Sequence, residues 1–112
     1  MVKVSTEGGP YDGRVFELSL EEDGEARMLG RSSGKRFKQS GISLSKDSEV
    51  SITHGKFENS GGKVTFTDVG STNGTEVDGE PAEKDHAYEM VAGSKLLIGQ
   101  GTFTVTLTWG QP

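Results

Sequence analysis

The sequence predicts an all-β fold, an antiparallel sandwich or barrel, from two observations. Apolar and polar residues alternate along many short stretches, which is the pattern of half-buried strands. Glycine-rich turn sequences separate these stretches, and Gly supplies 17 of the 112 residues, against roughly 7% in an average protein. No stretch carries the apolar stripe of a long helix.

Taken in chain order, eight stretches are expected to form strands: residues 2–6, 14–20, 26–30, 41–45, 54–59, 62–70, 94–99 and 101–109. The clearest are 62–70, which alternates about Val64 and Phe66, and 101–109, where apolar residues recur at every second position up to Trp109. We expect Trp109 to lie in the core. Residues 30–41 form the largest expected loop. Residues 80–90 contain Pro81 and no apolar stripe, so we expect a loop with at most one helical turn there.

Length and composition limit the possible functions. A chain of 112 residues predicts one domain over 1–112. The net charge of −5 argues against direct nucleic-acid binding, because phosphate backbones need clustered Lys and Arg. With no Cys and two His, the chain offers poor metal ligands, and we expect no metal or cofactor. No membrane-spanning run or signal region is present, so we expect a nuclear or cytoplasmic protein with no membrane partner.

Four short motifs follow one another in the chain. Gly30-Arg31 ends an expected strand, Ser51 and His54 stand in "VSITH", "DVGSTNGT" covers 68–75, and "VAGSKLLIG" covers 91–99. Each motif has an ordinary structural interpretation. Arg31 alone would be a surface charge, Ser51 a turn cap, and the segment 72–74 a hairpin turn with the Asn-Gly signal. By itself, His54 is expected to be a structural histidine.

In this order the motifs resemble the forkhead-associated (FHA) domain, and the resemblance extends over almost the whole chain. It implies an antiparallel β-sandwich of about eleven strands (FHA/SMAD-like) with binding loops at one end. It also implies a module that binds phosphothreonine peptides and is not an enzyme. The residues that it implies as phosphopeptide ligands are Arg31, Ser51, Thr72 and Asn73, with Asn73 on the peptide main chain. Additional contact candidates are Ser32, Lys35, Ile52 and Thr53, and the implied loop supports are Gly30, His54 and Gly74.

The residue types suit this chemistry. A phosphate carries about −1.5 to −2 charges and three acceptor oxygens near neutral pH. Arg31 supplies a planar fork that is always charged, and the hydroxyls of Ser51 and Thr72 supply small donors. Asn73 has both a donor and an acceptor for a peptide group. The basic group Lys35, Arg36 and Lys38 is either a solvated loop surface or an added attraction for a phosphopeptide.

Two departures from the family pattern concern affinity and specificity. Ile52 stands where the family often has Arg, which removes a cation near the phosphate. Glu49 lies where many members read the third residue after the phosphothreonine, and Glu76, Asp78 and Glu80 are expected on the facing loop. An acidic peptide residue would be repelled there, so we expect a preference for an apolar or basic one.

The leading hypothesis is therefore a phosphothreonine-dependent module of signalling or nuclear processes, whose partner is a phosphothreonine-containing protein. The domain is compatible with a place in a larger protein. The alternative is a scaffolding domain of the same fold that binds without phosphate. An enzyme is disfavoured because nothing in the sequence marks a third residue that would complete a catalytic triad with Ser51 and His54. The single Trp109 offers no aromatic platform for carbohydrate.

Overall fold

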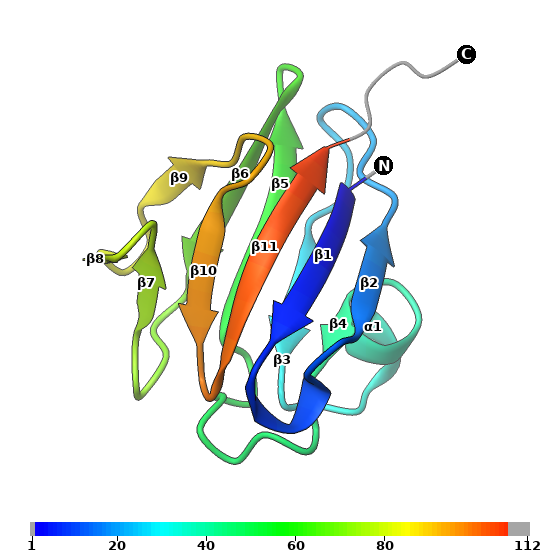
Figure 1. The fold of residues 1–112 in the computed structure, drawn as a ribbon. Helices are drawn as coiled ribbons and strands as arrows, with labels where there is room; N and C mark the ends of the chain where they lie inside the picture. Colours follow the sequence, from blue (N-terminus) through cyan, green and yellow to red (C-terminus); the bar gives the residue numbers. More distant parts are fainter. Residues whose placement is uncertain (1, 108–112) are drawn as a thin grey trace.

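Two β-sheets packed face to face make up the computed structural model, which describes residues 2–107 (Figure 1). The first sheet has the order β2-β1-β11-β10-β7-β8 and the second β4-β3-β5-β6-β9. Strands of the first sheet are β1 (Val2–Glu7), β2 (Val15–Leu18), β7 (Thr75–Val77), β8 (Glu80–Pro81), β10 (Lys95–Ile98) and β11 (Gly101–Leu107). Strands of the second are β3 (Arg27–Gly30), β4 (Ile42–Ser43), β5 (Gly55–Ser60), β6 (Lys63–Asp68) and β9 (Ala87–Glu89). The expected sandwich of about eleven strands is confirmed.

Pairing is antiparallel throughout except between β3 and β4, where Leu29 lies opposite Ile42 in a parallel pair. The longest ladder joins β1 to β11, from Val2 opposite Leu107 to Glu7 opposite Thr102. It ties the first strand of the chain to the last and places β2 and β8 at the two edges of the first sheet. The predicted end of the last strand at Trp109 lies outside the described residues.

The core lies between the sheets and follows the alternation of the strands. In β1 every second residue is buried, beginning with Val2 and Val4. Phe57 of β5 and Phe66 of β6 are fully buried and meet edge to face, with ring centroids 5.0 Å apart. Such pairs contribute about 0.5–1.5 kcal/mol beyond the burial of their area. The two rings lie opposite each other in the ladder of β5 and β6, the strands that adjoin the loops 44–54 and 69–74.

Two segments differ from the sequence expectation. Residues 80–90, expected to form a loop, contain the short strands β8 and β9, and Tyr88 of β9 pairs opposite Phe66 and packs against the core. These strands are two and three residues long, too short for alternation to be recognised. The expected loop 30–41 contains one helical turn, α1 (Lys35–Lys38), because Phe37 turns inward and is buried. A three-residue 3-10 turn, η1 (Gly9–Tyr11), precedes β2.

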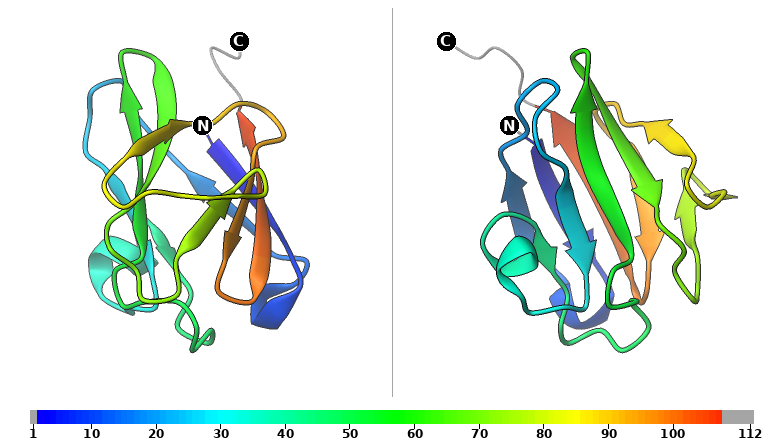
Figure 2. Two further views of the ribbon diagram at one scale, coloured as in Figure 1. Left: turned by 90° about the vertical axis from the view of Figure 1, so that its left-hand side faces the viewer. Right: turned by 180° about the vertical axis from the view of Figure 1, so that it is seen from behind.

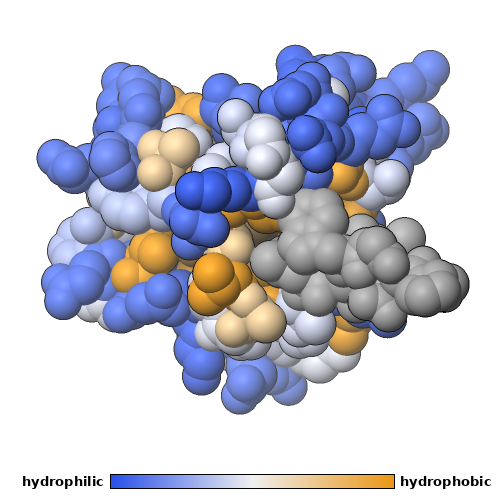
Figure 3. Space-filling model, turned by 90° about the horizontal axis from the view of Figure 1, so that it is seen from above, coloured by the Kyte–Doolittle hydropathy of each residue, from blue (hydrophilic) through white to orange (hydrophobic). Residues whose placement is uncertain are grey.

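Several loops meet at one end of the sandwich, at the bottom of Figure 1, and Figure 2 shows the same gathering from the side and from behind. They are 8–14, 31–34, 44–54, 69–74 and the turn at 99–100. Asp47 joins two of them, since its carboxylate accepts hydrogen bonds from the backbone N–H and side-chain Nε2 of Gln100 at 2.8 and 3.1 Å. The opposite end, seen in Figure 3, has hydrophilic residues around its rim and apolar ones toward its middle. None of the helices in residues 2–107 has the length and apolar character that a membrane span requires.

Candidate functional site

Arg31 is the first residue after β3, and two hydrogen bonds hold it against the loop 44–54. Its backbone N–H donates to the carbonyl of Ser51 at 2.9 Å, and its side-chain Nε donates to the carbonyl of Val50 at 3.0 Å. The residue is exposed, and among residues 2–107 its Nη groups have no hydrogen-bond or ion-pair partner. The guanidinium is therefore fixed on one side and presents the rest of its donor fork to solvent.

Gly30 is needed because the loop 44–54 passes directly over it. A Cβ atom at this position would lie 2.2 Å from the carbonyl oxygen of Ile52 and 3.0 Å from a ring carbon of Phe37. No side chain fits against a backbone oxygen at that distance. The bare backbone allows the Arg31–Ser51 bond to form, together with a 3.2 Å bond from the N–H of Ser32 to the carbonyl of Ile52.

Ser51 joins the loop 44–54 to the loop 69–74. Its hydroxyl oxygen accepts a hydrogen bond from the backbone N–H of Thr72 at 2.9 Å. Because the oxygen acts as acceptor in this bond, the hydroxyl hydrogen remains available to a ligand. Ser51 is half-buried and Thr72 is exposed, so both hydroxyls can be approached from solvent. This bond places the loop 69–74 next to the loop 44–54, whose Val50 and Ser51 hold Arg31.

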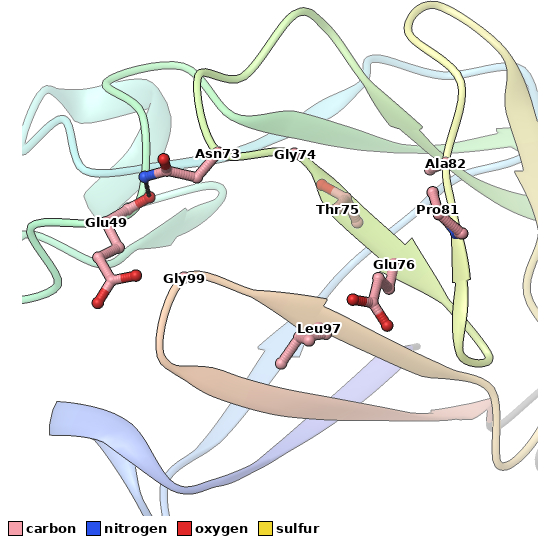
Figure 4. Close-up of a pocket in the computed structure, with 9 residues that line it drawn as sticks. All are labelled: Glu49, Asn73, Gly74, Thr75, Glu76, Pro81, Ala82, Leu97 and Gly99. Atoms are coloured by element: carbon pink, nitrogen blue, oxygen red, sulfur yellow. Dashed lines mark hydrogen bonds between the residues drawn. The ribbon is translucent and has the colours of Figure 1, made fainter.

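Asn73 makes a second link between the same loops, visible in Figure 4. Its Nδ2 donates to the carbonyl of Glu49 at 2.9 Å. Beside this bond opens a pocket of about 270 Å³ that has the carboxylates of Glu49 and Glu76 at its rim and Leu97 of β10 in its wall. Asn73 keeps its Oδ1 and one N–H for a ligand, next to a partly apolar, acidic pocket.

His54 is completely buried beneath these loops. Its Nδ1 accepts a hydrogen bond from the N–H of Ser51 at 3.1 Å, so the proton of the neutral ring is assigned to Nε2. Nε2 lies 3.1 Å from the carbonyl of Gly74 and 3.0 Å from the Thr75 hydroxyl. Burial lowers the pKa of His54 and outweighs the nearby Asp68 carboxylate, which acts in the opposite direction. The ring bridges two loops as a neutral group.

Asp68 organises the loop 69–74, a role that the sequence interpretation missed. Its carboxylate accepts from the N–H groups of Gly70 and Ser71 at 2.7 and 2.8 Å, and from the hydroxyls of Ser71 and Thr75 at 2.5 and 2.7 Å. Burial acts to raise the pKa of Asp68, but the bonds from Ser71, Thr75 and Gly70 prevail and hold it below the usual value. The sequence signal for this role is that Gly70 and Ser71 follow Asp68 by two and three residues, which is the spacing of an Asx turn.

The remaining sequence candidates occupy the same loops in different ways. Ser32 follows Arg31 and is half-buried, whereas Lys35 begins α1 and is exposed. Thr53 is exposed, and Ile52 leaves 60% of its surface in solvent. Gly74 has φ of +81°, a left-handed conformation that favours glycine, and places its carbonyl against His54.

The geometry suits anion binding better than catalysis. The unengaged Nη groups of Arg31 and the hydroxyls of Ser51 and Thr72 are all donors, and no carboxylate in residues 2–107 pairs with Arg31. His54 could not act as a base for Ser51, because both ring nitrogens are engaged and Nδ1 faces the backbone N–H of Ser51. Across the part of the chain that the structure describes, no group of three or more His, Cys, Asp or Glu is placed to hold a metal ion.

Comparison with known proteins agrees with this architecture. A family model, the FHA domain, matches residues 28–99, which is more than half of the chain. No curated protein matches the sequence.

Solved structures match nearly all of the chain at low sequence identity. One, from a structural and functional analysis of phosphothreonine-dependent FHA domain interactions, is 22% identical, with 96% of each chain covered and a TM-score of 0.74. The FHA domain of a hypothetical protein of Arabidopsis thaliana is 21% identical, with 99% of this chain and 88% of that chain covered and a TM-score of 0.81. EmbR of Mycobacterium tuberculosis, in complex with a low-affinity phosphopeptide, is 22% identical, with 99% and 25% covered and a TM-score of 0.73.

Proposed function

This chain belongs to the FHA domain family, and we propose that it binds phosphothreonine peptides of a partner protein through Arg31, Ser51, Thr72 and Asn73. FHA domains are binding modules rather than catalysts, and the function proposed here is binding alone. The partner would be a phosphorylated protein of signalling or nuclear processes, met in the nucleus or cytoplasm. The acidic net charge of −5 supports a protein partner over a nucleic acid.

One observation carries the proposal: the loop 44–54, which anchors Arg31, is also bonded to the loop 69–74 through Ser51 and Thr72. Ser51 accepts from the N–H of Thr72 at 2.9 Å, while the same stretch of the loop 44–54 anchors Arg31 through Val50 and Ser51. A phosphate there would receive charge-assisted bonds from Arg31 and ordinary bonds from two hydroxyls. Because these bonds already order the two loops and the Nε end of Arg31, they lower the entropy cost of ordering the site on binding.

Within this site we assign the phosphate to Arg31, Ser51 and Thr72 and the peptide main chain to Asn73. Asn73 lies on the pocket side, where its free Oδ1 and N–H can pair with a peptide group next to the phosphothreonine. Gly30, His54 and Gly74 support the loops from below and do not touch the ligand. Ser32, Lys35 and Thr53 are further contacts around the phosphate, and Ile52 provides an apolar one.

The test is calorimetric titration with a set of peptides, each made in phosphothreonine, phosphoserine and unmodified forms. We expect binding only of the phosphothreonine forms. Arg31→Ala should weaken this binding by about 10- to 100-fold, because a hydrogen bond to a charged group is worth about 1.5–3 kcal/mol. Equal binding of phosphorylated and unmodified peptides would overturn the proposal and would favour the scaffolding alternative.

Arg27→Ala is the matched control for this experiment. Arg27 also donates its Nε to a backbone carbonyl, that of Ser19 at 2.9 Å, but it stands at the start of β3, away from the loop end. Both variants lose one cation and one side-chain bond of the same kind. We expect Arg27→Ala to bind phosphopeptide like the unaltered protein, so that a loss confined to Arg31→Ala reports the phosphate contact.

A further inference from the structure

A second cleft opens at the edge of the sandwich formed by β2 and β4. Its volume is about 310 Å³, and its walls come from the loop 8–14, β2, the end of α1 and the residues around β4. β2 and β4 are edge strands of their sheets, and β8 and β9 form the other two edges. Figure 1 shows β7 and β8 on the side of the molecule away from β2 and β4, and residues of β7 and β8 help to line the acidic pocket beside Asn73.

Basic side chains converge on this cleft. Arg14 lines it from the loop 8–14, Lys38 from α1 and Lys46 from the loop 44–54, and none of the described residues that line it is acidic. Among residues 2–107, none of the three has a carboxylate within ion-pair distance. In a chain with 17 acidic and 12 basic residues, this is a local reversal of charge. Unneutralised cations facing one hollow create an attractive potential for an anion.

Arg14 and Tyr11 give the cleft a fixed wall. The guanidinium carbon of Arg14 lies 5.1 Å from the ring centroid of Phe16 and 5.9 Å from that of Tyr11, so its position is restrained by the two rings. Tyr11 is 7% exposed, and its hydroxyl accepts from the N–H of Lys46 at 2.9 Å. The phenolic hydrogen remains to be donated, and the exposed hydroxyl of Ser45 lines the same cleft.

We propose that this cleft is a second phosphoryl-binding pocket, which takes another phosphorylated side chain of the partner that Arg31 holds. Three cations and two hydroxyl donors match a dianion with three acceptor oxygens better than the single charge of Asp or Glu. The cleft also lies close to the first site in the fold. The hydroxyl of Ser43, in its wall, donates to the carbonyl of Ser32 at 2.8 Å, and Ser32 follows Arg31 directly. That the partner is also bound at Arg31 rests on the proposed function, whereas the affinity of the pocket for phosphate does not.

The first experiment compares singly and doubly phosphorylated peptides. A second phosphothreonine or phosphoserine is placed at each position within about five residues of the first, and parallel peptides carry Asp instead. We expect at least one doubly phosphorylated spacing to bind about tenfold tighter than the singly phosphorylated peptide, since one added charge-assisted bond is worth about 1.5 kcal/mol or more. No gain at any spacing, or an equal gain from Asp, would overturn the proposal.

Two double variants test whether the added affinity for the doubly phosphorylated peptide comes from this cleft. Arg14→Gln/Lys46→Gln removes two cations from the cleft, and the gain should disappear while the affinity for the singly phosphorylated peptide stays the same. Lys63→Gln/Lys95→Gln removes two exposed cations at the starts of β6 and β10, at the opposite end of the molecule, and should keep the gain. Thermal midpoints and the Lys46→Gln single variant guard against misfolding. A gain that persists in Arg14→Gln/Lys46→Gln would contradict the proposal.

A titration with inorganic phosphate tests the pocket separately from the peptide site. In Arg31→Ala, phosphate should still cause saturable NMR shifts of the amides of Ser45 and Lys46, and Arg14→Gln/Lys46→Gln should lack the Ser45 shift. These phosphate-induced shifts would support the second pocket even if no phosphothreonine peptide bound. The lack of peptide binding would then refute only the proposed function. Absence of saturable shifts at Ser45 and Lys46 would refute the second pocket alone. If excess free phosphate abolishes the added affinity of the doubly phosphorylated peptide, then free phosphate and the second phosphorylated side chain bind in the same cleft.

Discussion

Single polar residues determine the shape of the loops at the end of the sandwich that carries Arg31. Asp68 is 4% exposed, and its oxygens accept four hydrogen bonds from groups in residues 70–75. His54, fully buried, bonds the loop 44–54 through Ser51 and the loop 69–74 through Gly74. Small polar residues such as those of 70–74 cannot be ordered by apolar burial. Buried hydrogen-bond partners supply the order instead.

Gly30→Ala should both destabilise the protein and disturb the proposed phosphate site. The new Cβ would stand 2.2 Å from the carbonyl oxygen of Ile52, so the loop 44–54 must move away from β3. We expect a loss of about 1–3 kcal/mol in the free energy of unfolding, measured by urea denaturation. Affinity for phosphothreonine peptide should fall as well, because Arg31 is bonded to that loop through Val50 and Ser51.

Gly34→Ala is the control for this effect. Gly34 has φ of −67°, which any residue adopts, and an added Cβ would meet only the Ser32 hydroxyl at 3.4 Å. Its stability should stay within about 0.5 kcal/mol of the unaltered protein, as is usual for surface substitutions. Equal stability of the Gly30 and Gly34 variants would contradict the close approach seen at Gly30.

The sequence predicted some strands and missed others, and the length of the strand explains most of this difference. Alternation predicted β1, β6 and β11, which have six or seven residues each. It failed for β8 and β9, because a strand of two or three residues shows no period. These strands are ordered by long-range pairing, such as Tyr88 opposite Phe66. The turn α1 was missed because a buried Phe37 between basic residues resembles a solvated loop.

The same distinction applies to the candidate site. The resemblance of the short motifs to the FHA domain implied Arg31, Ser51 and Asn73 as candidates, and each of these motifs is a local sequence feature. Their partners were not predicted. The bond from Asn73 to the carbonyl of Glu49 joins residues 24 positions apart, and that from Thr72 to Ser51 joins residues 21 apart. Neither has a local sequence signal, and both depend on how the two loops meet in the folded chain.

The pocket formed by β7, β8 and β10 leads to a prediction about the peptide sequence. With Glu49 and Glu76 at its rim and Leu97 in its wall, it should accept a basic or apolar side chain and repel an acidic one. We expect an oriented phosphothreonine peptide library to show this preference at the third residue after the phosphothreonine. Glu49→Lys should reduce the selection of basic residues, whereas Glu89→Lys on the exposed edge strand β9 should not. Selection of acidic residues by the unaltered protein would refute the assignment.

At the scale of the whole molecule, charge is unevenly distributed over the end of the sandwich that we propose to bind the peptide. Carboxylates rim the pocket at the β7 and β8 edge, and cations with no ion-pair partner within residues 2–107 line the cleft at the β2 and β4 edge. Arg31, Ser51 and Asn73 lie on the loops between these edges. The two sheets hold the edges apart, since β2 and β8 are the outermost strands of one sheet. A peptide lying across the loops would therefore meet opposite charges at its two ends, which favours one direction of binding.

Acid should destabilise the whole fold, and the first loss should come from His54. Its folded-state pKa lies below the ordinary value of 6.5 because the ring is buried. In the unfolded chain the ring takes up a proton near that value, so the unfolded state binds more protons than the folded state at lower pH. The stability due to neutral His54 is therefore complete above about pH 6.5 and is lost as the pH falls from there toward the folded-state pKa. The pKa of Asp68 is also lowered, from 3.8, and this second contribution is lost only as the pH falls below that value.

Urea denaturation at about pH 7.5 and about pH 5 measures the first loss, because only histidine has an ordinary pKa between these values. The midpoint should be lower at the acidic pH, and His86→Gln, which removes the exposed histidine beside Tyr88, should leave that drop unchanged. An NMR titration of the His54 ring should show a pKa below its ordinary value. A pKa at or above that value, or a midpoint that does not change, would mean that protonated His54 fits between the loops. That is incompatible with Nδ1 accepting the N–H of Ser51, so the pH dependence tests the contact that holds Ser51 in the proposed phosphate site.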